Sequence, residues 1–273
     1  MKYCLTYRKG KDSLMNKADE LTIIYNRKDT TLLDFLLEHK NQRINILIQN
    51  VTTFKEDGDI ERIIAIKNKH SELQIFLQLD QIDTEFIKEL KVAKIPYFFS
   101  KFANNWDTFN GLIKMNVSDI YVVEDLGFNL DICAKKAHAA ATSIRVFPNI
   151  AQSQWKYTED IKKFFIRPED IDQYEPYIDT IEFISDENYQ DEVLYDIYAV
   201  KKEWFGPLKE IIKDFNNELD SRYVIPRFAE NRIKCGKKCA KNSSCSICET
   251  IEHLSRTLKE KEILVKMKKV DKR

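Results

Sequence analysis

Four cysteines near the C-terminus are the residues of this chain whose type and spacing are best suited to chemistry. They form a C-x3-C-x5-C-x2-C array at Cys235, Cys239, Cys245 and Cys248. Paired spacings of this kind close round a single metal ion. A cluster of free cysteines with no metal is the simpler alternative, but clustering in a chain without secretory features favours ligation over disulfides. We therefore predict that these four thiolates bind a metal.

The number and the chemistry of the ligands bear on which metal it is. Four cysteine ligands leave no open position on a zinc ion, so a zinc site here is expected to be structural. The five-residue spacer between Cys239 and Cys245 is shorter than the spacers of most zinc ribbons, and compact cysteine arrays also hold iron–sulfur clusters. The predicted cofactor is Zn²⁺, with a [4Fe–4S] cluster as the alternative.

The same end of the chain is strongly basic. From Arg232 onward there are thirteen lysines and arginines against five acidic residues, so this tail carries about +8 and the remainder about −8 in a chain with no net charge. A basic tail of this kind can bind the phosphates of a nucleic acid, although a solvated basic end is the commoner meaning. We name nucleic acid as the partner to test.

Hydropathy indicates a soluble, intracellular setting. The chain has no apolar run of the length that spans a bilayer, and its first residues, Met1 to Lys9, become polar too early for a signal peptide. We expect a cytoplasmic protein without membrane contact.

Short apolar runs alternate with helical patterns between residues 19 and 186, which is typical of repeated βα units around a parallel sheet. Eight segments are predicted as strands: Leu21 to Tyr25, Ile44 to Gln49, Leu73 to Leu79, Tyr97 to Lys101, Ile120 to Glu124, Ile144 to Phe147, Phe164 to Arg167 and Thr180 to Ile184. No glycine-rich phosphate loop follows the first of them, which disfavours dinucleotide and P-loop folds.

Eight strands with crossovers favour closure, because an open sheet would leave two edges to protect. The predicted fold is an α/β protein, a (β/α)8 TIM-type barrel with a small C-terminal four-cysteine metal module and a terminal helix. An open doubly wound sheet is the alternative. We expect the barrel in residues 1–220 and the module with its basic helix in residues 221–273, where Ile251 to Met267 has helical spacing.

In such barrels the chemistry sits on the loops that follow the strands. Polar side chains follow most of the predicted strands, and three are proposed as catalytic residues: Glu182, Arg167 and Glu124. Carboxylates facing a cation at a barrel mouth can do acid–base work or bind an anionic ligand. The competing interpretation is that these charges are solvated or paired with each other.

Part of the chain resembles a known family. Val117 to Gly127 is similar to the strand and turn "G-V-D-A-hydrophobic-Q-D-L-G" of the collagenase-like peptidase family of unknown catalytic type. Ser143 to Gln152, Phe165 to Ile171 and Ile181 to Phe183 resemble the next pieces of that family in matching order, so the resemblance covers about residues 117–184. The family places a cysteine soon after its E-x-F strand, whereas the clustered cysteines of this chain come about fifty residues later.

The resemblance implies a barrel with a cysteine-bound cofactor and with Arg167 and Glu182 at its mouth. The family includes iron–sulfur hydroxylases that act on RNA or quinones. Two hypotheses follow, and whether the chain is an enzyme is left open between them. One is a metal-binding barrel protein that modifies RNA or another anionic substrate, and the alternative is a non-catalytic, zinc-stabilised binding or structural assembly protein.

Overall fold

The computed structural model of the 273-residue chain describes most of the barrel and parts of the C-terminal region. The described residues are 1–7, 12–25, 32–151, 164–184, 190–216, 219–224, 228–233, 235, 248–250, 253–254, 256–257 and 260–261. They form two compact units. The first comprises Met1–Val122, Ala134–Val146 and Ile178–Glu182, and the second comprises Val123–Cys133, Phe147–Tyr177 and Phe183–Arg273.

The first unit contains one sheet of eight parallel strands in the order β5-β4-β3-β2-β1-β8-β7-β6. The strands are β1 (Lys2–Thr6), β2 (Glu20–Ile24), β3 (Arg43–Ile48), β4 (Gln74–Leu79), β5 (Tyr97–Phe99), β6 (Asp119–Tyr121), β7 (Ser143–Val146) and β8 (Thr180–Glu182). The two ends of this order are joined as well, because the backbone N–H of Ser118 donates to the Tyr97 carbonyl and that of Ala103 to the Tyr121 carbonyl, both at 2.8 Å. The predicted (β/α)8 barrel is confirmed.

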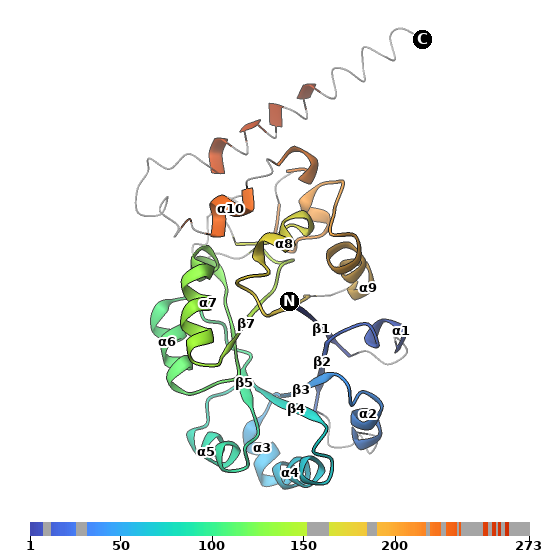
Figure 1. Ribbon diagram of the computed structural model, residues 1–273, viewed down its shortest axis with the longest axis vertical. Coiled ribbons are helices and arrows are strands. Elements are labelled where there is room, and N and C mark those ends of the chain that lie inside the picture. The colour runs from blue at the N-terminus through green and yellow to red at the C-terminus, as the bar shows by residue number, and fades with distance from the viewer. Residues whose placement is uncertain are drawn as a thin grey trace. The chain divides into compact units, whose positions relative to one another are not determined.

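Helices connect successive strands and lie outside the ring, as Figure 1 shows. They are α1 (Asp12–Met15), α2 (Leu32–Glu38), α3 (Val51–Glu56), α4 (Asp59–Lys69), α5 (Thr84–Val92), α6 (Trp106–Lys114) and α7 (Leu130–Ala139). Three of them begin with a side-chain cap, in which Asn50, Asp83 and Asn105 each accept from a backbone N–H of the first turn. Such caps satisfy donors that the helix itself leaves open and fix where each helix starts.

Two of the strand predictions need correction. Lys2–Thr6 is a strand, β1, and pairs with both β2 and β8, although it was not predicted. Phe164 to Arg167 is not a barrel strand: β7 pairs directly with β8, and the N–H of Ile166 donates to the Pro148 carbonyl at 3.1 Å. The apolar run there is buried by aromatic packing in the second unit, where Phe164 contacts Phe128 and Phe165 contacts Phe215.

The second unit is built mainly from short helical segments. These include 3-10 turns at Glu124–Asn129, Pro168–Asp170, Leu208–Glu210 and Ser221–Tyr223, a π-helical turn at Asp196–Lys201, and the helices α8 (Ile171–Tyr174), α9 (Asp191–Tyr195) and α10 (Phe228–Ile233). The predicted C-terminal module falls entirely within this unit. The described residues between 248 and 261 are helical, within and just before the predicted terminal helix.

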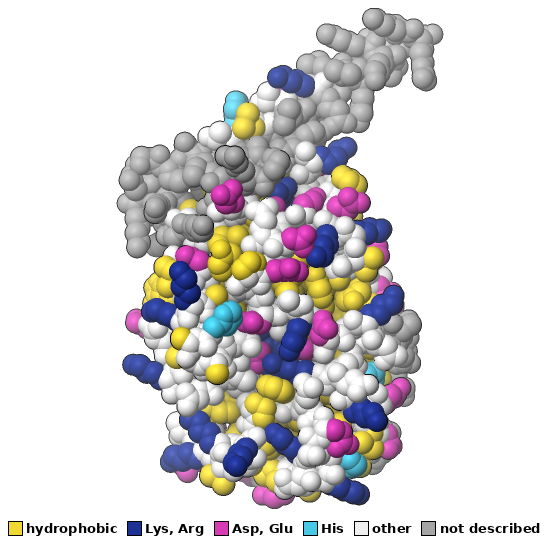
Figure 2. All heavy atoms as spheres, in the orientation of Figure 1, with side chains coloured by type: hydrophobic (Ala, Val, Ile, Leu, Met, Phe, Trp, Pro, Cys, Tyr) yellow, Lys and Arg dark blue, Asp and Glu magenta, His cyan; other side chains and the backbone are white. Residues whose placement is uncertain are grey.

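Charged side chains of both signs are interspersed over the face seen in Figure 2. Within the described part of the chain, no helix has the length and apolar composition needed to cross a membrane.

Candidate functional site

The interior of the barrel holds a group of charged side chains, which we call the interior network. It consists of Glu20 of β2, Arg43 of β3, Asp119 of β6, Arg145 of β7 and Glu182 of β8. All five are buried, with at most 7% of their surface exposed. Ionised groups are rarely enclosed in this way unless they are paired, so the partners of each one decide what the group can do.

Strand register explains why these side chains meet. Successive residues of a strand point to opposite faces, so residues two apart share a face. Glu20 is in register with Arg43 and with Cys4, and Cys4 is in register with Glu182. Tyr121 is in register with Arg145 in the same way. Residues far apart in the sequence are thereby brought onto the inner face of one ring.

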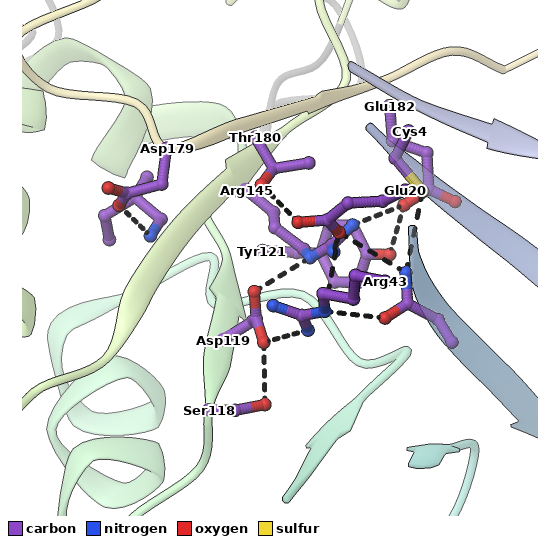
Figure 3. Close-up of polar contacts among 12 residues, drawn as sticks. Cys4, Glu20, Arg43, Ser118, Asp119, Tyr121, Arg145, Asp179, Thr180 and Glu182 are labelled. Carbon is purple, nitrogen blue, oxygen red and sulfur yellow. Dashed lines mark hydrogen bonds and ion pairs between the residues drawn. The ribbon is translucent and has the colours of Figure 1, made fainter. Parts of the chain in front are cut away.

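Arg145 is the centre of the network, as Figure 3 shows. Its guanidinium donates to all three carboxylates: Nε to Asp119 at 3.0 Å, Nη1 to Glu182 at 3.2 Å, and Nη2 to Glu20. The guanidinium carbon also lies 5.0 Å from the centre of the Phe98 ring. A planar group with several donors suits this task, because one side chain can bind acceptors from three strands at once.

Arg43 supplies the second positive charge. Its Nη2 donates to Asp119, its Nε donates to the side-chain oxygen of Asn45 at 2.9 Å, and its guanidinium stacks 3.6 Å from the centre of the Phe76 ring. Asp119 also accepts from the hydroxyl of Ser118 at 2.6 Å. Asp119 is thus held by both arginines.

The network contains three carboxylates but only two guanidinium groups, and this imbalance appears in the pKa values. Burial raises the pKa of Glu182, and although Arg145 and the hydrogen bond from Tyr121 oppose this, the pKa stays above its usual value. Burial also acts to raise the pKa of Asp119, but Arg145 and Arg43 outweigh it and the pKa is lowered. The Tyr121 hydroxyl lies 2.5 Å from the Glu182 carboxylate. Of Glu182 and Asp119, Glu182 is therefore the carboxyl that more readily takes up a proton.

The position of the network along the strands bears on its role. Glu20, Arg43 and Asp119 are the first residues of their strands. Barrel enzymes carry their reacting groups at the opposite, C-terminal ends of the strands, whereas the N-terminal end contributes stability. A surface depression of about 420 Å³, lined by residues such as Lys94, Tyr97, Asn116 and Ser118, lies on the loops that enter β5 and β6 and so also at the N-terminal end. Glu182, in contrast, is the last residue of β8 and lies at the end where barrel enzymes carry their reacting groups. The bonds of Arg145 to carboxylates of three other strands give the network a structural role in holding the barrel together.

The three residues predicted to be catalytic occupy different settings. Glu182 belongs to the interior network of the first unit. Arg167 belongs to the second unit, where its Nε and Nη2 each donate to the Asp170 carboxylate at 2.7 Å. Glu124 begins the 3-10 turn after β6, and its side chain lies outside the described residues. Arg167 and Glu182 are each bonded within their own unit, so their joint role at a barrel mouth stays a prediction.

Four members of the network were not predicted: Glu20, Arg43, Asp119 and Arg145. A signal for them exists in the sequence, since each is a charged residue at the start of, or inside, an otherwise apolar strand, as in Ser143–Val146. Strands of a parallel barrel are covered on both faces, so a charge within one must be enclosed and needs a partner.

Two of the four predicted metal ligands are described. Cys235 and Cys248 are half-buried and form no disulfide, while Cys239 and Cys245 lie outside the described residues. Burial lowers the pKa of the Arg232 guanidinium, and Tyr174, Cys248, Asp170 and Cys235 act to raise it. In the part of the chain that the structure covers, no group of three or more His, Cys, Asp or Glu residues is placed to hold a metal ion.

We predict that Arg145→Met destabilises the fold by about 3–5 kcal/mol, because it leaves buried carboxylates without their shared cation. Urea unfolding followed by circular dichroism measures this change. The control is Lys88→Met, which removes a cation from the exposed pair with Glu85 and should leave the unfolding midpoint unchanged. An unfolding midpoint for Arg145→Met equal to that of the wild type would show that the network does not stabilise the barrel.

A second prediction concerns pH. Because the folded-state pKa of Glu182 is raised above the ordinary value of 4.5, its contribution to stability is fully present below that value and is lost as the pH rises through the raised pKa. Glu182→Gln is neutral at every pH, so its stability should decline less than that of the wild type between about pH 5 and about pH 8. Urea midpoints across this range provide the measurement, with exposed Glu85→Gln as the control. Parallel pH profiles for wild type and Glu182→Gln would contradict the assignment.

The sequence matches no protein-family model and no curated protein. Among solved structures it is similar to the U32 peptidase Mk0906, with a TM-score of 0.40 and 10% sequence identity over 68% of this chain and 94% of that chain. U32 peptidases are the collagenase-like family that residues 117–184 resemble. We draw no functional conclusion from a structural similarity of this degree.

Proposed function

We propose that this protein is a metal-binding (β/α)8-barrel protein in which Cys235, Cys239, Cys245 and Cys248 together bind one zinc ion. The observation that carries this proposal is the C-x3-C-x5-C-x2-C spacing of the four cysteines. Cys235 and Cys248, the first and last of the array, are both half-buried and both belong to the second unit. Paired spacings of this kind are what a single metal ion requires of its ligands.

The chemistry of the donors fits zinc. Four thiolates complete a tetrahedral zinc site, and metal binding of this kind contributes directly to folding free energy. In the second unit such a site would tie α10 to the helical residues that begin at Cys248. A reducing compartment such as the cytoplasm keeps free thiols available for this role. A [4Fe–4S] cluster uses the same four ligands and is the alternative that the experiment must distinguish.

Elemental analysis of the purified full-length chain tests the proposal. We expect about one zinc per chain and no visible colour. The double variant Cys235→Ser/Cys248→Ser should lose the metal, because two of its four ligands are gone. Cys133→Ala is the control, since Cys133 is buried beside the Leu126 carbonyl in the same unit and is not part of the array. It should retain the metal.

Two other results would change the assignment. Iron and inorganic sulfide with broad visible absorption would identify the iron–sulfur alternative and would support the likeness to cluster-containing hydroxylases. Neither zinc nor iron, with all four thiols alkylated readily in the folded protein, would rule out the metal site.

A role in binding or modifying RNA or another anionic substrate follows from the charge of the tail, which favours phosphate groups as partners. If the tail contacts RNA, the logarithm of the binding constant should fall with the logarithm of the salt concentration, by about 0.7 for each phosphate neutralised on a single strand. Binding without RNA modification would agree with the alternative of a zinc-stabilised binding or assembly protein.

Neutralising the end of the tail gives a direct test. We expect a variant with glutamine at Lys266, Lys268, Lys269, Lys272 and Arg273 to bind a single-stranded RNA oligonucleotide more weakly and with a shallower salt slope. Fluorescence anisotropy at several salt concentrations measures both. The matched control replaces five lysines of the barrel surface with glutamine: Lys55, Lys69, Lys88, Lys91 and Lys94. An equal loss in both variants would mean that the tail has no specific role.

A further inference from the structure

Two polar side chains at the C-terminal ends of neighbouring barrel strands carry oxygen atoms whose hydrogen bonds are not made. Gln78 is the penultimate residue of β4 and is 6% exposed, and Ser100 directly follows β5. Among the described residues, Gln78 Oε1 and Ser100 Oγ are enclosed and have no hydrogen-bond partner. An enclosed polar atom without a partner costs free energy, so each of these two oxygens requires an explanation.

Strand register places both side chains on the inner face of the ring. Gln78 is in register with Phe98, and the Phe98 ring centre lies 5.0 Å from the guanidinium carbon of Arg145 inside the barrel. Ser100 lies two residues after Phe98, and its N–H continues the ladder by donating to the Leu79 carbonyl at 2.9 Å. Residues two apart along a strand share a face. Gln78 and Ser100 are therefore neighbours on the inner face.

The nitrogen of the Gln78 side chain is already bonded. Nε2 donates to the Tyr121 hydroxyl at 3.4 Å, and that hydroxyl donates to the Glu182 carboxylate at 2.5 Å. Because the hydroxyl gives its proton to Glu182, it presents its oxygen to Gln78, and the amide turns its NH2 group toward it. The amide oxygen is left for another donor. Tyr121 and Glu182 are the last residues of β6 and β8, and all of these residues belong to the first unit.

The two oxygens define the group that would complete them. Gln78 Oε1 can only accept a hydrogen bond, whereas the Ser100 hydroxyl can donate one as well. An amide carries an N–H and a carbonyl side by side and so offers one donor and one acceptor. An anion is disfavoured, because the guanidinium groups of Arg43 and Arg145 already donate to carboxylates of the interior network. An uncharged amide matches both the hydrogen bonding and the charge.

Phe102 supplies apolar surface at the same end of the strands. Its side chain is 39% exposed, and its ring packs edge-on to the Tyr121 ring with the two centres 5.8 Å apart. A planar ligand can pack against an aromatic ring of this kind. Since the oxygens of Gln78 and Ser100 are enclosed, binding requires a side chain to move, and exposed side chains change rotamer within nanoseconds.

We propose that the inner face at the C-terminal ends of β4 and β5 binds an uncharged amide group. The amide N–H donates to Gln78 Oε1, and the amide carbonyl accepts from the Ser100 hydroxyl. Barrel proteins bind their ligands at this end of the strands. The site lies within the first unit and does not depend on the metal site proposed for the second.

The test measures binding of 2-pyridone, a ring amide, to the full-length chain by saturation-transfer NMR titration. N-methyl-2-pyridone has the same ring but no N–H, so it leaves Gln78 Oε1 without a donor. We expect the wild type to bind 2-pyridone about tenfold or more tightly than the methylated probe. A parallel titration with acetamide distinguishes an open-chain carboxamide from a ring amide as the preferred source of the group.

Gln78→Met keeps the length of the side chain and removes the acceptor. We expect this variant to bind 2-pyridone and N-methyl-2-pyridone equally, within about twofold, because the bond that separates them is lost. The matched control is Gln74→Met, which changes an exposed glutamine of the same strand and should keep the preference of the wild type. Circular dichroism checks that each variant is folded.

Three results would overturn the site. The first is a wild type that binds the two pyridones equally, and the second is a folded Gln78→Met variant that keeps the preference for 2-pyridone. If Gln78→Met does not fold, Ser100→Ala decides: weaker binding of 2-pyridone supports the site, and unchanged binding is the third such result. The metal content of the chain is measured separately, so failure here leaves the proposed function standing.

Discussion

Two guanidinium groups and three carboxylates are enclosed by the strands of the barrel, and their mutual pairing is the constraint on which the first unit depends. Arg145 donates to carboxylates from β2, β6 and β8, and it is itself carried by β7. The strands on both sides of β7, and β2, which does not neighbour it, are therefore tied to one side chain. A slip of one residue in any of these strands would turn its charged residue away from the interior.

The pairing also limits what the interior can do. A guanidinium that already donates to three carboxylates has little capacity left for a ligand, and a carboxylate held by two arginines is a poor base because its pKa is lowered. Glu182 differs, since its pKa is raised and the Tyr121 hydroxyl lies 2.5 Å away. Excess negative charge in the network is relieved at this carboxyl. This makes the network sensitive to pH at one residue.

The barrel could be predicted from the sequence because strand periodicity is a local signal. Seven of the eight strands lie at or near the predicted positions. The other, Lys2–Thr6, is a short strand with a polar residue at each end, so its apolar pattern is weak. Its place between β2 and β8 depends on pairing with residues far along the chain. Phe164 to Arg167 has the composition of a strand, but its aromatic residues are buried by other aromatic residues of the second unit.

The site residues were harder to predict because pairing is not local. Glu182 was singled out for its place at the end of a strand, yet its partner Arg145 lies 37 residues earlier and Arg145 meets Glu20 across 125 residues. Arg167 was expected at the barrel mouth, a role that stays a prediction, and its nearest partner is Asp170, three residues away, to which it donates two hydrogen bonds. The signal in the sequence is the charge inside each apolar strand, because a buried charge needs a partner of opposite sign.

Two of the buried arginines, Arg145 and Arg232, show how the same side chain is accommodated differently in the two units. Arg145 forms ion pairs with three carboxylates of the barrel, and these pairs hold the strands together. Arg232 lies against the rings of Phe128, Phe165 and Phe228, which stabilise a cation through cation–π contacts.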